Sequence, residues 1–180
     1  MDQIDINRLW QNFTDTITNH YTDFNGRVGR TQFWYYIAVY IVVAILVSIV
    51  GSIVGIGSGL RGLFSLALLL PNIGMTARRL QDTGRPGTWA WLLIVPLGLA
   101  ILTGIFAFAT WFALGLFGLW LILAPLMSLL GLASLAVAIA LIYFCAQPGT
   151  SGPNQYGPEP AQWSPNAPPA TPATPPPAAT

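Results

Sequence analysis

Residues 89–144 contain no charged side chain, and this stretch limits what the chain can fold into. A helix needs about 20 apolar residues to cross a bilayer, so the stretch has the length of two spans and a turn. Tryptophan and tyrosine favour the membrane interfaces, and pairs of them here lie roughly one bilayer thickness apart at about 1.5 Å per residue. The predicted spans are 89–111 and 120–144, joined by a tight turn near 112–119 that contains Gly115 and Gly118.

The overall composition is also typical of a membrane protein. Hydrophobic residues make up 54% of the chain and charged residues 7%, against about 25% charged residues in soluble domains. Two more apolar stretches, 33–56 and a short one at 62–77, complete a set of four predicted spans. The predicted fold class is therefore an all-α membrane protein, with a four-span transmembrane helical bundle within residues 25–147.

The second predicted span contains two residues that are unusual inside a membrane helix, Pro71 and Asn72. Proline has no backbone N–H, so the carbonyl of Ala67, four residues earlier, loses its helical partner. Asn72 is the most polar side chain in any predicted span, and we expect it to face protein. A kinked helix with an internal hydrogen bond is one interpretation, and a functional polar site within the membrane is the other.

All seven basic residues are arginines, and their distribution predicts the orientation of the chain. Six of them precede the first predicted span or lie between the second and the third, whereas Arg61 lies on the other side. Short loops rich in arginine stay in the cytoplasm. Both termini and the central loop are therefore predicted to be cytoplasmic, in a multi-pass protein.

The two ends of the chain differ from its middle. Residues 1–24 place apolar side chains three and four positions apart, which predicts a cytoplasmic amphipathic helix on the membrane surface or against the protein itself. Residues 148–158 are rich in turn formers, and residues 159–180 are dominated by Pro, Ala and Thr. Such a tail cannot bury enough apolar surface to fold, so it is predicted to be disordered.

Three short motifs follow one another along the chain. They are FNGRVGRTQFW at 24–34, RRLQDTG at 78–84, and PGT at 148–150 followed by GPNQYG at 152–157. Over about residues 20–158 they resemble the signatures of domain-of-unknown-function family 805, a group of small bacterial inner-membrane proteins. Gln81 replaces the histidine common in that family, and Pro86 and Gly87 replace its serine and tryptophan. The resemblance implies a helical bundle in the bacterial inner membrane, and no particular reaction.

The sequence contains no recognisable pattern for catalysis, a cofactor or a metal ion. It has a single histidine and a single cysteine, no HExxH, no glycine-rich phosphate loop and no pair of acidic residues in a span. We therefore expect a non-enzymatic protein without a cofactor or metal, and nothing in the sequence indicates nucleic acid as a partner.

The remaining polar chemistry is a group of charged residues on the predicted cytoplasmic face. Guanidinium groups bind phosphate bidentately, so anionic lipid headgroups are expected ligands, with a homo-oligomer or another membrane protein as further candidate partners. Alternatively, these arginines only set topology and pair with Asp82 and Asp23; Arg78 and Arg79 lie one helical turn before Asp82. The alternative function is a small oligomeric channel or transporter for a neutral or weakly charged solute. The group consists of Arg27, Arg30, Arg78, Arg79, Asp82 and Arg85.

Overall fold

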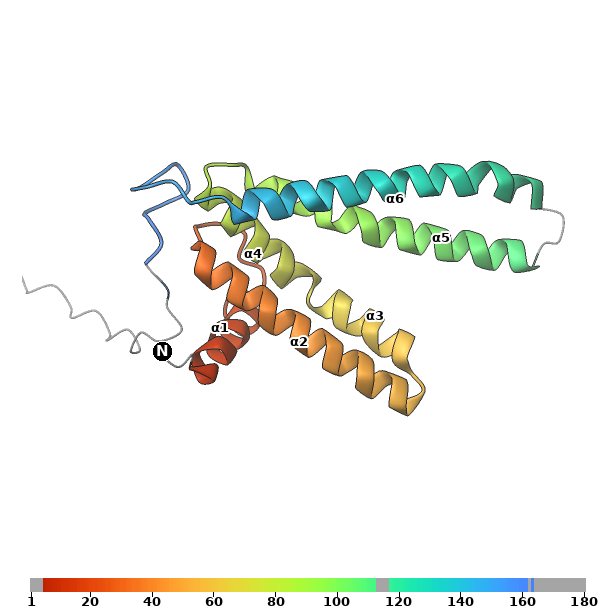
Figure 1. Cartoon of the computed structure of the whole chain (residues 1–180), viewed down its shortest axis with the longest axis horizontal. Helices are drawn as coiled ribbons and strands as arrows, with labels where there is room; N and C mark the ends of the chain where they lie inside the picture. The colour runs from red at the N-terminus through yellow and green to blue at the C-terminus, as the bar shows by residue number, and fades with distance from the viewer. Residues whose placement is uncertain (1–4, 113–116, 162, 164–180) are drawn as a thin grey trace, which may run out of the picture.

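The computed structural model describes residues 5–112, 117–161 and 163, and in these residues the chain is helical (Figure 1). Apart from one isolated antiparallel bridge between Asn154 and Gly157, the described part contains no strand pairing. The elements in chain order are α1 (Ile6–Thr18), α2 (Arg30–Val54), α3 (Gly57–Ala67), α4 (Leu69–Asp82), the 3-10 helix η1 (Gly87–Leu93), α5 (Ile94–Phe112) and α6 (Phe117–Ala146).

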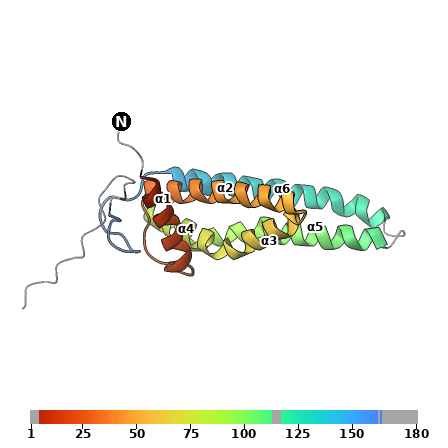
Figure 2. The same ribbon diagram turned by 90° about the horizontal axis from the view of Figure 1, so that it is seen from below.

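Two helical hairpins diverge from one shared end of the molecule (Figure 1). The first is made by α2 and α3, and the second by α5 and α6, which reaches farther from the shared end. Seen from below, the two hairpins run in the same general direction (Figure 2). Buried side chains gather at the shared end, where α1, α4 and η1 meet the adjoining ends of α2 and α6; they include Phe13, Phe33, Tyr36, Ile73, Met75, Leu80, Ala90, Leu141 and Cys145.

The turn between α2 and α3 depends on glycine. Gly55 ends α2 in the left-handed conformation, with φ of 80°, which costs a residue without a Cβ very little. A Cβ built on Gly51 would lie 2.9 Å from the Cα of Gly57, so this glycine lets the two helices approach closely within one chain. Gly59 has no heavy atom within 4 Å of an added Cβ, so it takes no part in the close approach.

Three helical segments of the described chain are long and apolar enough to cross a membrane: Arg30–Val54, Gly87–Phe106 and Ala124–Ala146. A fourth is formed if α3 and α4 are counted together as one span, although they meet at a bend of 42°. The chain is thus mostly helical, with three to four candidate membrane spans. Of the predicted turn near 112–119, residues 113–116 lie outside the described residues, as does the tail from residue 164 onward.

The bend between α3 and α4 falls at Leu68, just before Pro71. Pro71 therefore occupies the first turn of α4, where a helix needs no backbone donor. The Ala67 carbonyl, which the proline leaves without a helical partner, accepts a 2.5 Å hydrogen bond from the hydroxyl of Tyr21. A residue of the N-terminal segment thereby supplies the hydrogen bond that the proline removes.

Helix α1 packs against the shared end of the hairpins. Phe13 is buried and stacks on Tyr36 of α2, with ring centroids 5.6 Å apart. Asn12 donates to the backbone carbonyl of Gln32, and the Gln32 amide donates in return to Asn12 at 3.0 Å. Trp10, on the same predicted apolar stripe as Phe13, remains about half exposed. The structure thus has α1 packed against the protein, with part of the predicted apolar stripe uncovered.

Candidate functional site

The predicted charged residues do not form one continuous surface, and three of them come together in the interior. Arg79 and Asp82 lie one helical turn apart at the end of α4 and form an ion pair. Arg27, which precedes α2, binds the same carboxylate through its Nε at 3.0 Å. The side chains are 1% exposed for Arg27, 0% for Arg79 and 4% for Asp82. These three residues are named the arginine–aspartate cluster below.

The guanidinium group of Arg79 donates to four acceptors within the protein. Its Nε donates to the carbonyl of Cys145 at 2.9 Å, and its Nη2 donates to the carbonyl of Gln147. Its Nη1 donates both to Asp82 and to the carbonyl of Val28, at 3.3 Å for the latter. Arg79 therefore links α4 to the segment that precedes α2 and to the end of α6.

Arg27 is held in a similar way by backbone carbonyls that follow α6. One terminal nitrogen donates to the carbonyl of Thr150 at 2.6 Å, and the other donates to the carbonyl of Gly152, also at 2.6 Å. Each arginine thus has the carboxylate of Asp82 and at least two carbonyl groups as acceptors. Because hydrogen bonds to a charged group stabilise more than neutral ones, both guanidinium groups are well compensated for their burial.

Residues 147–157, named the C-terminal strap below, are bound to the end of α4. The backbone N–H and the hydroxyl of Thr150 both donate to the backbone carbonyl of Asp82, at 2.8 and 3.0 Å. The side-chain amide of Asn154 donates to the carbonyl of Gln81 at 3.0 Å. These bonds satisfy carbonyls that the end of a helix leaves without partners.

Gly149 allows the C-terminal strap to pass directly over the carboxylate of Asp82. A Cβ built on Gly149 would lie 2.2 Å from Asp82 Oδ2 and 2.8 Å from its Cγ, closer than any side chain tolerates. The glycine is thus required by the close approach of backbone to carboxylate.

The other predicted arginines lie around the cluster and are engaged to different degrees. A terminal nitrogen of Arg78 lies 4.0 Å from a carboxylate oxygen of Asp23, and another donates to the sulfur of Met75 at 3.2 Å. The guanidinium carbon of Arg85 lies 4.3 Å from the ring centroid of Phe144, a cation–π contact.

Arg30, by contrast, lies in the first turn of α2 with its side chain exposed. It borders a polar cavity of about 580 Å³ whose wall includes Thr31, Glu159 and the arginine–aspartate cluster. Arg30 is therefore the predicted site residue with the most open access to a ligand from outside.

The structure brings Pro71 and Asn72 to the helix bend and not to the charged cluster. The side-chain oxygen of Asn72 accepts a 2.9 Å hydrogen bond from the hydroxyl of Tyr36 in α2. This links the bent pair α3–α4 to α2 at the point where the helix is interrupted. The Asn72 oxygen thus bonds to protein, and the residue also borders an apolar cavity.

Sequence reasoning missed the acceptors that complete the cluster, because most of them are backbone carbonyls and carry no sequence signal. Thr150, Asn154 and Gly149 belong to the strap, whose turn-rich composition predicted only irregular structure. The third motif did carry one indication of these contacts. Its polar residues follow a long apolar helix directly, and polar groups buried at a helix end need hydrogen-bond partners.

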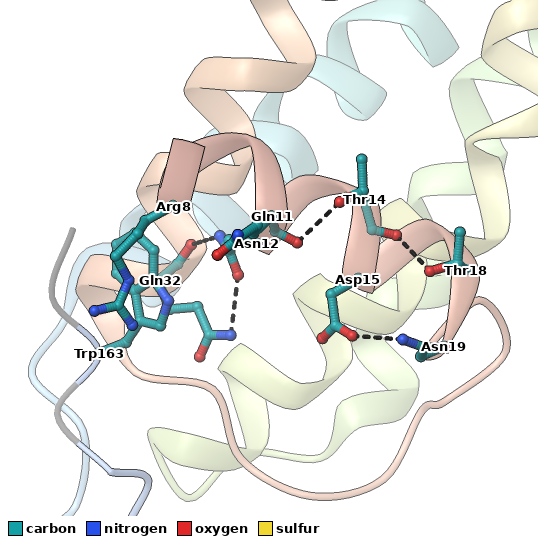
Figure 3. Close-up of a pocket in the computed structure, with 9 residues that line it drawn as sticks. All are labelled: Arg8, Gln11, Asn12, Thr14, Asp15, Thr18, Asn19, Gln32 and Trp163. Atoms are coloured by element: carbon teal, nitrogen blue, oxygen red, sulfur yellow. Dashed lines mark hydrogen bonds between the residues drawn. The ribbon is translucent and has the colours of Figure 1, made fainter. Parts of the chain in front are cut away.

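A second polar pocket lies beside α1, and Figure 3 shows its lining side chains. It has a volume of about 460 Å³ and is bordered by Arg8, Asp15, Gln32 and Trp163, among others. Several of its polar groups already bond to one another, as in the Asn12–Gln32 pair (Figure 3). None of the predicted site residues borders this pocket.

Comparison with known proteins supports the interpretation of the three motifs. The model of the family described as "Protein of unknown function (DUF805)" matches residues 21–158, which include all three. The chain is 33% identical over 147 residues to uncharacterized protein YiiR of Escherichia coli strain K12, covering 79% of this chain and 88% of that protein. It is 29% identical over 146 residues to inner membrane protein YhaI of the same strain, covering 81% of this chain and 92% of that protein. No solved structure matches.

Together with the long apolar helices, these relatives identify an integral membrane protein whose function is unknown. The match also confirms the predicted family resemblance, and it extends from the end of the N-terminal segment through the C-terminal strap. All the residues of the arginine–aspartate cluster and their carbonyl acceptors fall within it.

The cluster predicts strong coupling between its members. Asp82→Asn removes the charge that compensates two buried guanidinium groups, and should lower the free energy of unfolding in mixed micelles by about 3–5 kcal/mol. Arg79→Gln should also destabilise, and the double variant should cost less than the two single changes together, by about 0.5–3 kcal/mol. As a control, the effects of Asp82→Asn and Arg61→Gln should add, because Arg61 is exposed on α3. Additive effects for Asp82 and Arg79 would contradict the pairing.

The close approach of Gly149 gives a second prediction. Gly149→Ala should displace the strap from Asp82 and lower the unfolding free energy by about 1–3 kcal/mol, the usual cost of overpacking. Gly131→Ala in α6 is the matched control, because an added Cβ there meets no heavy atom within 4 Å. Denaturant unfolding of both variants in the same detergent would measure the difference, and equal stability of the two would show that the strap has room to move.

Proposed function

Because this chain belongs to the DUF805 family, whose function is unknown, we propose a function from the arrangement of its charged residues. The protein is a non-enzymatic, four-span protein of the bacterial inner membrane that interacts with anionic lipid headgroups through its cytoplasmic side. Arg30 is the residue that makes this contact.

The proposed topology counts the bent pair α3–α4 as one span, together with α2, α5 and α6. The bend at Leu68 is compatible with a span because the Tyr21 hydroxyl donates to the freed carbonyl of Ala67, and the Tyr36 hydroxyl donates to Asn72 beside the bend. With four spans both ends of the chain lie on one side, and the arginine distribution favours the cytoplasm for that side. Residues of the N-terminal segment, the end of α4 and the strap all contact one another, as this topology requires.

The exposure of Arg30 is the single observation that carries the lipid proposal. Arg27 and Arg79 direct their donors to carbonyls and to Asp82, so they have little capacity left for an outside phosphate. Arg30 precedes Trp34 by one helical turn, and tryptophan favours the headgroup region of a bilayer. A guanidinium group at this depth suits a phosphate, which it binds through two parallel hydrogen bonds.

We propose a non-enzymatic role because the buried charges are used to hold segments of the chain together.

The contacts of Asn72 likewise disfavour a channel or transporter built around that residue. Its side-chain oxygen bonds to Tyr36, and the cavity that Asn72 borders has a mostly apolar wall, which suits a polar solute poorly. Flux of small neutral solutes into liposomes containing the purified protein would favour the transport alternative.

The four-span topology predicts the behaviour of reporter fusions. Alkaline phosphatase, which is active only outside the cytoplasm, should be active when fused after Arg61 and inactive when fused after Gly84 or after Gln147. The reason is that one crossing separates Arg61 from Gly84, and two crossings separate Gly84 from Gln147. Activity at Gln147 would mean an odd number of crossings and would exclude this topology.

The lipid proposal predicts a change in copurifying lipid. Arg30→Gln should lower the ratio of anionic to zwitterionic lipid bound to protein purified from native membranes by about fivefold, the contribution of one arginine near a membrane surface. Mass spectrometry of the extracted lipid measures this ratio. Arg61→Gln is the comparison variant at the opposite membrane surface, and an equal fall in that variant would contradict a specific role for Arg30. An unchanged ratio in Arg30→Gln would refute the role of Arg30.

A further inference from the structure

The two diverging hairpins leave a cavity of about 570 Å³ between them near the shared end. Side chains from α2, α4, α6 and the α3 end contribute to its wall, together with Leu93 of η1. The volume lies within the roughly 300–1,000 Å³ typical of small-molecule sites. The apolar and aromatic part of the wall includes Phe33, Trp34, Ile37, Leu141, Ile142 and Cys145.

The wall of this cavity favours a hydrocarbon occupant over water. Its polar residues from α4 already bond within the protein. The Asn72 side chain accepts from Tyr36, and the hydroxyl of Thr76 donates to the backbone carbonyl of Asn72 at 2.8 Å. A cavity needs several polar partners to hold ordered water, whereas most of the residues in this wall are apolar.

Trp34 connects the cavity to Arg30. The same side chain lines the apolar cavity and a smaller one of about 290 Å³, whose wall also includes Arg30, Thr31 and Tyr35. Arg30 and Trp34 lie four residues apart and therefore on one face of α2. Trp34 is thus a shared wall between the apolar cavity and a smaller one that the exposed Arg30 borders.

We propose that this cavity binds one acyl chain of an anionic phospholipid whose phosphate group contacts Arg30. The inference rests on the proposed function of Arg30 and extends it from headgroup attraction to a defined lipid site. The positive charge complements the phosphate, and the apolar wall complements the chain. A second copy of the protein is a poorer fit, because a helix is about 10–12 Å wide and needs more room than this cavity offers.

The test uses the full chain, delipidated in detergent and titrated with phosphatidylglycerol, with native mass spectrometry as the readout. Ala138 lines the cavity, so Ala138→Phe should fill it and reduce bound phosphatidylglycerol by at least about fivefold, the low end of overpacking costs. Ala140→Phe is the matched control, because Ala140 is exposed on the same helix and does not line the cavity. Arg30→Gln should reduce binding of phosphatidylglycerol and leave binding of phosphatidylcholine nearly unchanged. Thermal unfolding in the same detergent checks that each variant folds.

The outcomes distinguish the role of Arg30 from the acyl-chain site in the cavity. Loss of phosphatidylglycerol in both Ala138→Phe and Arg30→Gln supports the lipid site. Loss in Arg30→Gln with full binding in Ala138→Phe overturns the acyl-chain cavity and leaves the role of Arg30 intact. Loss in Ala138→Phe alone overturns the role of Arg30. Competition by glycerol 3-phosphate at the same concentration as the lipid would overturn the cavity, because that probe has no acyl chain. A dimer that Ala138→Phe dissociates, without bound lipid, would assign the cavity to a second copy.

Discussion

The carboxylate of Asp82 lies between the guanidinium groups of Arg27 and Arg79, and the shared end of the molecule depends on this contact. One carboxylate cannot neutralise two buried cations. The remaining compensation comes from backbone carbonyls at the entrance of α2, the end of α6 and the C-terminal strap. Because carbonyl groups are fixed to the backbone, satisfying the two arginines also fixes the positions of those segments. The cluster thus fastens together helices that make few other contacts with one another.

This arrangement explains how the protein combines an ordered end with widely separated hairpins. Outside the shared end, α2, α5 and α6 present many exposed apolar side chains, as surfaces in contact with lipid do. Packing between apolar helices gains little in a bilayer, because lipid tails are equally apolar. Polar contacts at one end therefore hold the hairpins together. The space between the hairpins keeps an apolar wall. The apolar cavity between the hairpins follows from placing the strongest contacts at one end.

The sequence contained enough information for the long apolar helices and for the pairing within α4, because both depend on local spacing; it did not predict the 42° bend that divides the second predicted span into α3 and α4. Arg79 and Asp82 are three residues apart, and helix geometry alone brings them together. The partner of Arg27 could not be predicted, because 55 residues separate it from Asp82 and the contact exists only after folding. Pro71 showed which carbonyl would lack a partner, but not that Tyr21 would supply the bond from the N-terminal segment. The sequence also could not distinguish the exposed Arg30 from the arginines that donate to carbonyls, since both kinds lie close to the ends of predicted spans.

The same sequence separations determine the order in which the network can assemble. Arg79 and Asp82 are neighbours on one helix, whereas Arg27 and its acceptor Gly152 are 125 residues apart. Contacts between distant residues close long loops and tend to form late in folding. Until residues 147–157 have been synthesised, both guanidinium groups lack several of their final acceptors. The network can therefore be completed only once residues 147–157 have joined the helices, because the two guanidinium groups gain several of their acceptors from that segment.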